Sequence, residues 1–263
     1  MPSQDIPEEI RNPHGFPETA DIETSNDDYA TRFRGATGAW MLAVQERGVV
    51  RLLGDLTRPG ARILDVGGGH GQLARPLAAL GCKVTVLSSA ESCRHRISDL
   101  VDSGAVEFKV GNVIDLPFGD GAFDAVVAVR MLTHCGQWPK LVREMCRVSA
   151  GPVVTDYPTS QSLNAVAPAL FERKKKFEKN TRPWTLFRHR QVEEAFAAAG
   201  YRRTRRYGQF FLPMVVHRAL KCRPLSAALE GLCRIAGLTR LWGTPVIVRM
   251  DPLPSESAAQ KNP

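Results

Sequence analysis

The sequence lacks the features of a membrane-spanning, secreted or zinc-binding protein. Its longest strongly apolar run, FFLPMVV at 210–216, is far shorter than the roughly 20 residues that a membrane span needs. The N-terminal residues MPSQDIPEEIRNPHGFPET are polar and acidic, without the charged-then-apolar pattern of a secretion signal. The six cysteines are scattered and form no C-x-x-C pair, which argues against a zinc site. We therefore expect a cytoplasmic protein with no bound metal.

Acidic residues are scarce in one part of the chain, so its net charge of +8 is unevenly distributed. Residues 171–224 carry fifteen Lys/Arg against four Asp/Glu, whereas the first 30 residues are acidic. A basic block of this kind suits an acidic substrate, an anionic membrane surface or RNA, and equally a solvated face. Because polybasic attraction is not specific, the charge alone does not choose among them.

Short apolar runs alternate with helical segments through most of the chain. We predict strands at 61–66, 83–87, 106–110, 123–129, 152–157, 201–211 and 244–250. We predict helices within 29–56 and at 72–80, 93–104, 139–148, 191–200 and 224–237. Single helices between nearly all-apolar strands indicate a parallel sheet covered on both faces. Ligands bind such sheets at the C-terminal ends of the strands.

The same pattern suggests one domain with two tails. Residues 1–25 and 251–263 are polar and aperiodic, so we expect flexible tails there and a single domain over 26–250. Within it, helices over 26–58 precede the first strand. Residues 159–190 interrupt the strand–helix alternation, and we expect them to form a lid over the substrate site. Leu225, Leu229, Leu232 and Ala236 are spaced as one face of an amphipathic helix.

A glycine-rich loop, LDVGGGHGQL at 64–73, joins the first strand to the next helix. Such a loop lets the backbone turn sharply and approach a nucleotide-type ligand closely. The dinucleotide pattern G-x-G-x-x-G fails because Gln72 stands at its last position, and the G-K-[ST] of a P-loop is absent. What remains is the series Gly67-x-Gly69-x-Gly71, preceded by Asp65.

This loop resembles motif I of the class I S-adenosylmethionine-dependent methyltransferases. Two later segments, GNVIDLPFGDGAFDAVVAV (111–129) and LTHCGQWPKLVREMCRV (132–148), resemble the ubiquinone/menaquinone-biosynthesis-like, type 11 group of that family. The ordered match covers about residues 60–157. The resemblance implies S-adenosyl-L-methionine as cofactor and an α/β, doubly wound Rossmann-like sheet. We expect this sheet to be mostly parallel, with an antiparallel C-terminal strand.

The resemblance also implies roles for individual residues. The loop residues would meet the methionine part of the cofactor, the end of the second strand its ribose, and the residues after the third strand its adenine. In that order these residues are Asp65, Gly67, Gly69 and Gly71, then Ser88 and Ser89, then Asn112 and Val113. Arg130, at the end of the fourth strand, would lie where cofactor and substrate meet.

One of these positions departs from the family pattern. The second strand usually ends in Asp or Glu, which holds both ribose hydroxyls, whereas Ser88 stands there in this chain. A serine makes one hydrogen bond where a carboxylate makes two charge-assisted ones. The resemblance therefore predicts weaker cofactor binding, a ribose held by other groups, or a protein that has lost activity.

His134 is the candidate catalytic base. It follows the fourth strand, near the expected position of the methyl group, and its pKa range suits proton removal from a hydroxyl. The alternative is that His134 caps the next helix or packs on the cofactor. Candidates for the substrate pocket are aromatic and are equally ordinary packing residues, namely Tyr29, Phe33, Tyr157 and Trp184.

Together these observations predict methyl transfer to a small, partly apolar molecule, at a hydroxyl. One alternative is an RNA or protein methyltransferase that uses the basic C-terminal third, although no recognisable RNA-binding module is present. Another is a catalytically weak cofactor-binding protein, which Ser88 keeps open. The sequence does not indicate the oligomeric state.

Overall fold

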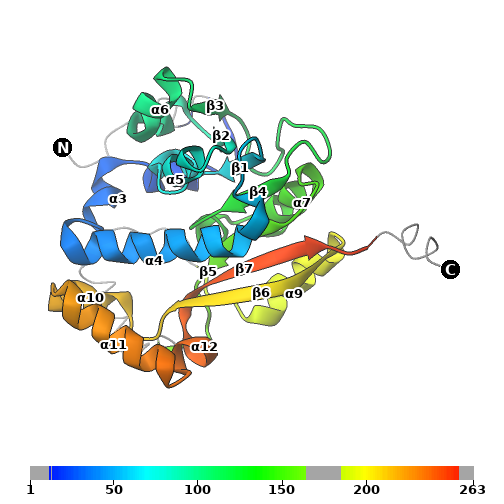
Figure 1. The fold of residues 1–263 in the computed structure, drawn as a ribbon. Helices are drawn as coiled ribbons and strands as arrows, with labels where there is room; N and C mark the ends of the chain where they lie inside the picture. Colours follow the sequence, from blue (N-terminus) through cyan, green and yellow to red (C-terminus); the bar gives the residue numbers. More distant parts are fainter. Residues whose placement is uncertain (1–11, 13, 164–184, 255–263) are drawn as a thin grey trace.

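A seven-stranded sheet forms the centre of the protein. The structure, a computed structural model, describes residues 12, 14–163 and 185–254. The strand order is β3-β2-β1-β4-β5-β7-β6 (Figure 1). The strands are β1 (Arg62–Val66), β2 (Lys83–Ser88), β3 (Val106–Val110), β4 (Ala125–Ala128), β5 (Val153–Tyr157), β6 (Tyr201–Phe210) and β7 (Thr244–Pro252). Strands β1 to β5 pair in parallel, and β7 runs antiparallel to both β5 and β6. The predicted mostly parallel sheet with an antiparallel C-terminal strand is confirmed.

Helices cover both faces of this sheet. The longest is α4 (Gly35–Leu53), which lies across β5, β6 and β7 (Figure 1). The others are α2 (Ala20–Thr24), α3 (Asp27–Thr31), α5 (Ala74–Ala79), α6 (Ser98–Asp102), α7 (Trp138–Val148), α9 (His189–Ala198), α10 (Met214–Leu220), α11 (Arg223–Ile235) and α12 (Leu238–Trp242). Short 3-10 turns occur at Gly54–Leu56, Gly68–His70, Glu91–Ile97 and Leu132–His134.

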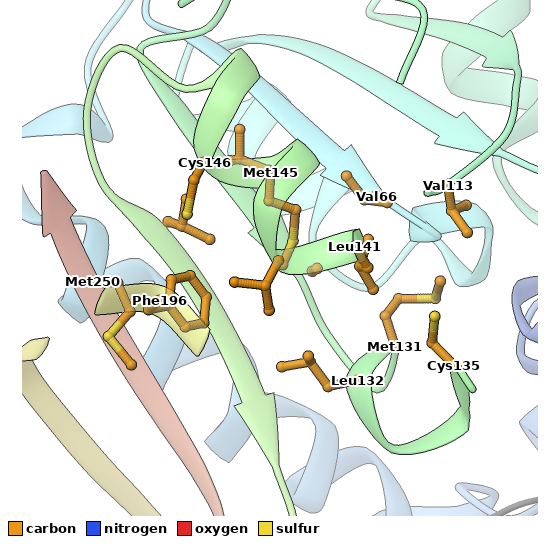
Figure 2. Close-up of a cluster of buried hydrophobic side chains, with 14 of the residues drawn as sticks. Val66, Val113, Met131, Leu132, Cys135, Leu141, Met145, Cys146, Phe196 and Met250 are labelled. Carbon is orange, nitrogen blue, oxygen red and sulfur yellow. The ribbon is translucent and has the colours of Figure 1, made fainter. Parts of the chain in front are cut away.

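Two apolar clusters fill the space between the sheet and its helices. One lies under α4 and α5 and includes Ile63, and the other lies under α7 and α9 and includes Leu64. Consecutive residues of β1 thus point to opposite faces, as the pleat of a strand requires. Figure 2 shows the second cluster, in which Phe196 of α9 and Met145 of α7 pack on the same face of the sheet. Both faces are buried, which explains why the strands read as continuous apolar runs.

Residues 18–25 differ from the expected flexible tail. They pack onto the sheet edge, and Asp21 of α2 is fully buried there. The bounds of the predicted strands agree closely, but the helix predicted at 93–104 is a 3-10 turn followed by the short α6, and α10 and α12 were not predicted. Pro76 lies in the first turn of α5, where its missing N–H has no helical partner to lose. Most of the expected lid at 159–190 lies outside the described residues.

Helix α11 forms where an amphipathic helix was predicted, but its orientation is the reverse of the expected one. Leu225 and Leu232 are exposed, whereas Ser226 and Glu230 are buried. The helix therefore has its polar side against the protein.

Candidate functional site

The glycine loop lies at the edge of the sheet where parallel strands β1 to β4 end. Gly67 and Gly71 have φ angles of +73° and +77°, a conformation that favours glycine. The Gly67 N–H donates to the carbonyl of Leu87 at 2.7 Å, which ties the loop to the end of β2. A Cβ atom on Gly69 would lie 2.5 Å from the Cys93 carbonyl oxygen. The backbone of this loop is thus packed too closely for side chains.

Asp65 precedes the loop and is buried beneath it. A Cβ atom on Gly68 would lie only 2.2 Å from Oδ2 of Asp65, so the carboxyl group lies directly against the loop backbone. Burial raises the pKa of Asp65 to about 7, and the positive charge of Arg130 partly opposes this shift. The loop therefore lies on a carboxyl group that changes its charge near neutral pH.

Arg130 is held at the end of β4 in an unusual backbone conformation. Its φ angle is +62°, which is rare for a residue with a side chain. Its N–H donates to Oδ1 of buried Asp156 at 2.6 Å, and Oδ2 of the same carboxylate accepts from Gln45 at 2.6 Å. These bonds fix the turn and direct the guanidinium group over the rings of Tyr29 and Phe33, at 5.5 and 5.3 Å from their centroids.

His70 completes an aromatic and cationic cluster beside the loop. Its ring lies edge-on to Tyr29 and Phe33, with centroid distances of 6.1 Å to each. Burial, followed by the charges of Arg130 and Arg96, lowers the pKa of His70 to about 3. The imidazole is therefore neutral at physiological pH. Tyr29 is placed by the capping of α3, because its N–H donates to the Asn26 side chain at 2.8 Å.

Several buried polar atoms of this site have no hydrogen-bond partner among the residues that the structure describes. They are Oγ of Ser88, both ring nitrogens of His70, and Nε and Nη1 of Arg130. Buried polar groups in native proteins are nearly always paired, so a group of such atoms indicates a missing polar ligand. This set of donors and acceptors, in and beside a glycine-rich loop, fits a ligand with a carboxylate and hydroxyl groups.

A carboxylate does lie beside the end of β2, although the strand does not supply it. Asp21 of α2 accepts from the N–H of Ser89 and from its hydroxyl, both at 2.6 Å. Burial raises the pKa of Asp21, while these hydrogen bonds lower it. No local pattern predicts this contact, because Asp21 and Ser89 lie 68 residues apart.

The segment around Asp21 covers the loop. Glu18 accepts hydrogen bonds from the N–H groups of Gly136 and Gln137, at 3.1 and 2.6 Å. Oγ of Ser25 lies 2.6 Å from the position that a Cβ atom on Gly69 would take. Residues 18–25 therefore cover the glycine loop and the end of β2.

The remaining candidate cofactor residues follow β3. Oδ1 of Asn112 accepts from the N–H of Ile114 at 3.1 Å, so its side chain shapes its own turn. Val113 is buried, and Figure 2 shows its side chain near those of Met131 and Cys135. Their proposed contacts with adenine stay predictions.

The candidate catalytic and substrate residues are less closely grouped. His134 lies partly buried in the 3-10 turn after β4, on the same edge of the sheet as the loop. Tyr157 is fully buried in the core, where its hydroxyl lies 2.9 Å from Nδ1 of His189. Trp184 lies outside the described residues. Of the predicted pocket residues, Tyr29 and Phe33 are thus the two that lie beside His70 and Arg130.

The described residues contain no group of three or more His, Cys, Asp or Glu side chains that could hold a metal ion. Within the same residues, every helix is too short or too polar to cross a bilayer.

The raised pKa of Asp65 predicts a pH dependence of stability. The folded protein keeps a proton up to about pH 7 that the unfolded chain, with a pKa of about 3.9, has released. The free energy of unfolding should therefore fall as pH rises between these values, by up to about 1.4 kcal/mol per pH unit from this group. The variant Asp65→Asn lacks this titrating group. Its free energy of unfolding minus that of the parent should therefore be larger at about pH 8 than at about pH 5.

Urea unfolding at the two pH values measures the difference. Other buried carboxyl groups, such as Asp156, are common to both proteins and cancel in the comparison. Asp28→Asn serves as the control, because Asp28 is exposed. An effect of Asp65→Asn that is equal at the two pH values would contradict the assignment.

Comparisons with known proteins agree with this geometry. A family model described as a methyltransferase domain, type 11, matches residues 64–151. A glycine/sarcosine/dimethylglycine N-methyltransferase from Actinopolyspora halophila is 36% identical over 109 residues, which are 39% of this chain and 19% of that protein. A ubiquinone biosynthesis O-methyltransferase from Xanthomonas campestris is 42% identical over 79 residues, which are 29% of this chain and 33% of that protein. The matches therefore span well under half the length of these relatives.

Solved structures share the fold over most of the chain. Magnesium protoporphyrin IX methyltransferase from Synechocystis, with bound S-adenosylhomocysteine, is 12% identical with a TM-score of 0.59, covering 88% of this chain and 97% of that one. Geranyl diphosphate methyltransferase in complex with S-adenosylmethionine is 17% identical with a TM-score of 0.58, covering 86% and 95%. At identities this low, the similarity shows that the folds are alike and nothing more. Residues 64–151 are therefore similar to methyltransferase domains, and most of the chain has the fold of the solved methyltransferases named above.

Proposed function

We propose that this protein is an S-adenosylmethionine-dependent methyltransferase that acts on a small, partly apolar molecule, at a hydroxyl group. The observation that carries the proposal is the group of unpaired buried polar atoms around the glycine loop, on Ser88, His70 and Arg130. The family of the domain supports the cofactor. The two relatives described above are named as an N- and an O-methyltransferase, so the choice of a hydroxyl rests on the position of His134.

Different residues of the site would bind different parts of the cofactor. Arg130 would bind the carboxylate of the methionine part, because two of its buried nitrogens have no partner within the described chain. The glycine loop would approach the same part with its backbone, and Ser88 would donate to a ribose hydroxyl. When bound, S-adenosylmethionine supplies a methyl group on a sulfonium, and its displacement requires an in-line approach. Neutral His70 adds no positive charge near that sulfonium.

A cavity beside the loop is the candidate entrance for the acceptor. It has a volume of about 350 Å³ and is lined by Asp27, Ala30, Phe33, Arg34, Leu42, His70 and Arg96. Apolar and aromatic side chains beside two arginines and one aspartate suit a partly apolar molecule that carries polar groups. His134 would accept the hydroxyl proton of the acceptor as the methyl group is transferred.

Cofactor entry requires residues 18–25 to move in this proposal. Asp65, Ser88 and Ser89 are all buried, and Asp21 lies against Ser89. Burying the carboxyl group of Asp21 costs desolvation energy. This cost destabilises the closed position of α2 and so favours its opening. Segment 18–25 thus acts as a cover that opens to admit the cofactor and closes behind it.

A catalytically weak cofactor-binding protein remains the second candidate. Ser88, in place of the usual acidic residue, is the observation that favours it. A [4+2]-cyclase, SpnF, also shares the fold, with 20% identity and a TM-score of 0.53. The experiments below separate cofactor binding from methyl transfer and so distinguish the two candidates.

Isothermal titration calorimetry with S-adenosylmethionine tests the cofactor site. We expect the parent protein to bind it and Gly69→Val to bind at least about tenfold more weakly, because a side chain at 69 collides with the Cys93 carbonyl. Gly231→Ala is the matched control, since a Cβ atom there meets nothing within 4 Å. Arg130→Gln, which leaves the loop unchanged, should also weaken binding. A parent protein that does not bind S-adenosylmethionine would sink both candidate functions.

Methyl transfer tests the role of His134. With a panel of small phenols as acceptors and release of S-adenosylhomocysteine as readout, His134→Ala should lower kcat by about 10² or more. It should also remove the rise of kcat with pH that a histidine base produces. His95→Ala is the control, because the side chain of His95 is 70% exposed. If His134→Ala keeps the parent kcat and pH profile, His134 is not the base.

Stopped-flow association of S-adenosylmethionine tests the cover. Asp21→Ala removes the contact with Ser89, so the association rate constant should rise severalfold. Asp28→Ala, on exposed α3, should leave it unchanged. An unchanged association rate with faster dissociation would instead make Asp21 a direct ligand of the cofactor, and the cover would be rejected.

A further inference from the structure

Helix α11 presents apolar side chains to solvent along one face. Leu225, Leu232 and Ile235 are 45%, 65% and 86% exposed, and they recur at helical spacing. The opposite face, which packs on the protein, carries the buried polar residues Ser226 and Glu230. A helix on the surface of a globular protein normally has the reverse arrangement.

Hydrogen bonds hold α11 in this orientation. The carboxylate of Glu230 accepts from the N–H groups of Phe211 and Leu212, each at 2.9 Å, and lies 3.0 Å from Nε2 of His217. Rotating the helix to bury its leucines would remove all three contacts and leave the fully buried His217 without its carboxylate partner. The exposed apolar face is therefore built into the fold.

The two neighbouring helices enlarge this face. α10 adds Val215 and Leu220, which are 50% and 37% exposed, and α12 adds Leu241 and Trp242, which are 56% and 46% exposed. Helices α10, α11 and α12 contact one another in sequence and lie together at the end of the molecule opposite to β3 and α6 (Figure 1). We call the exposed apolar side chains of α10, α11 and α12 together the apolar face. Many exposed apolar side chains on neighbouring helices mark an interaction site.

The charges around the apolar face have one sign. From β6 to the end of α12, residues 201–243 contain nine Lys/Arg and a single acidic residue, Glu230, which is buried. Lys221, Arg223 and Arg240 are exposed on the helices themselves. Of the exposed arginines of β6, Arg206 contacts α12, since its guanidinium donates to the Arg240 carbonyl at 3.1 Å, whereas Arg203 is paired with Glu193. The face is thus apolar, bordered by cations, and without exposed carboxylates in the described part of this region.

We propose that the apolar face docks onto an anionic lipid surface. Apolar side chains of an interfacial helix enter the boundary between headgroups and acyl chains, while Lys and Arg bind the anionic headgroups. Trp242 suits this position, since Trp is enriched at membrane interfaces. A second copy of this chain would bring equal positive charges together across a two-fold axis. RNA would use the cations but leave Leu232 and Ile235 in water. The proposal does not depend on methyl transfer.

Sedimentation with lipid vesicles tests the proposal. The protein should pellet with vesicles of phosphatidylcholine and phosphatidylglycerol in equal parts, and much less with phosphatidylcholine alone. Leu232→Glu should weaken the binding at least about tenfold, because it places a charge in the apolar boundary. Leu80→Glu is the matched control, since Leu80 is an exposed leucine, at 42%, on a different helix end. Replacing Lys221 and Arg223 by Gln should weaken the binding and reduce its dependence on salt.

Other outcomes would overturn the proposal. One is failure of the parent protein to pellet with anionic vesicles at low salt. A second is a concentration-dependent dimer, seen by light scattering and lost in Leu232→Glu, because the occupant would then be another copy. A third is bound RNA that Leu232→Glu retains and the Lys221 and Arg223 variant loses. Unchanged thermal unfolding of Leu232→Glu ensures that lost binding does not reflect lost folding.

Discussion

The buried carboxylate of Asp156 connects the parts from which the site is built. It accepts from the N–H of Arg130, from Gln45 of α4 and from Gln209 of β6, and burial raises its pKa. The first bond stabilises the positive φ angle of Arg130, which would otherwise cost about 1–3 kcal/mol. With that turn fixed, the guanidinium group lies over the rings of Tyr29 and Phe33, and its charge acts on both Asp65 and His70.

Buried charge is the second constraint on the site. Desolvation raises the pKa values of Asp21, Asp65 and Asp156, whereas the guanidinium of Arg130 lowers those of Asp65 and Asp156. The site therefore holds carboxyl groups at a cost, and each is compensated by hydrogen bonds or by one cation. A ligand that brings a carboxylate to Arg130 and hydroxyl groups to Ser88 would satisfy atoms that the described chain leaves unpaired. The proposed ligand and the buried carboxyl groups would thus share the positive charge of Arg130. In the proposal, the cover at 18–25 shields these groups from water.

The sequence predicts those features that depend on local pattern. Apolar runs locate the strands of the sheet to within a few residues, and the spacing of Gly67, Gly69 and Gly71 identifies the loop. Contacts between distant segments leave no such trace. Asp21 contacts Ser89 from a segment that has the polar composition of a flexible tail. Nothing in the sequence distinguishes Asp156, which binds the N–H of Arg130, from the other acidic residues. For α11, periodicity gives the helix correctly, but Glu230 and its backbone partners decide which face is buried. Trp184 lies outside the described residues.

A small apolar cluster connects the candidate acceptor side with the apolar face. Phe33, which lies under Arg130, packs in the same cluster as Met41 of α4, Phe210 of β6 and Met214 of α10. Trp40 of α4 packs against both Phe210 and His217, and His217 in turn contacts Glu230 of α11. The rings beside the cavity and the helices of the apolar face are therefore supported by common residues. If this face docks on lipid, an apolar acceptor dissolved in that lipid would start close to Phe33, and a partly apolar substrate is the kind for which such an arrangement is useful.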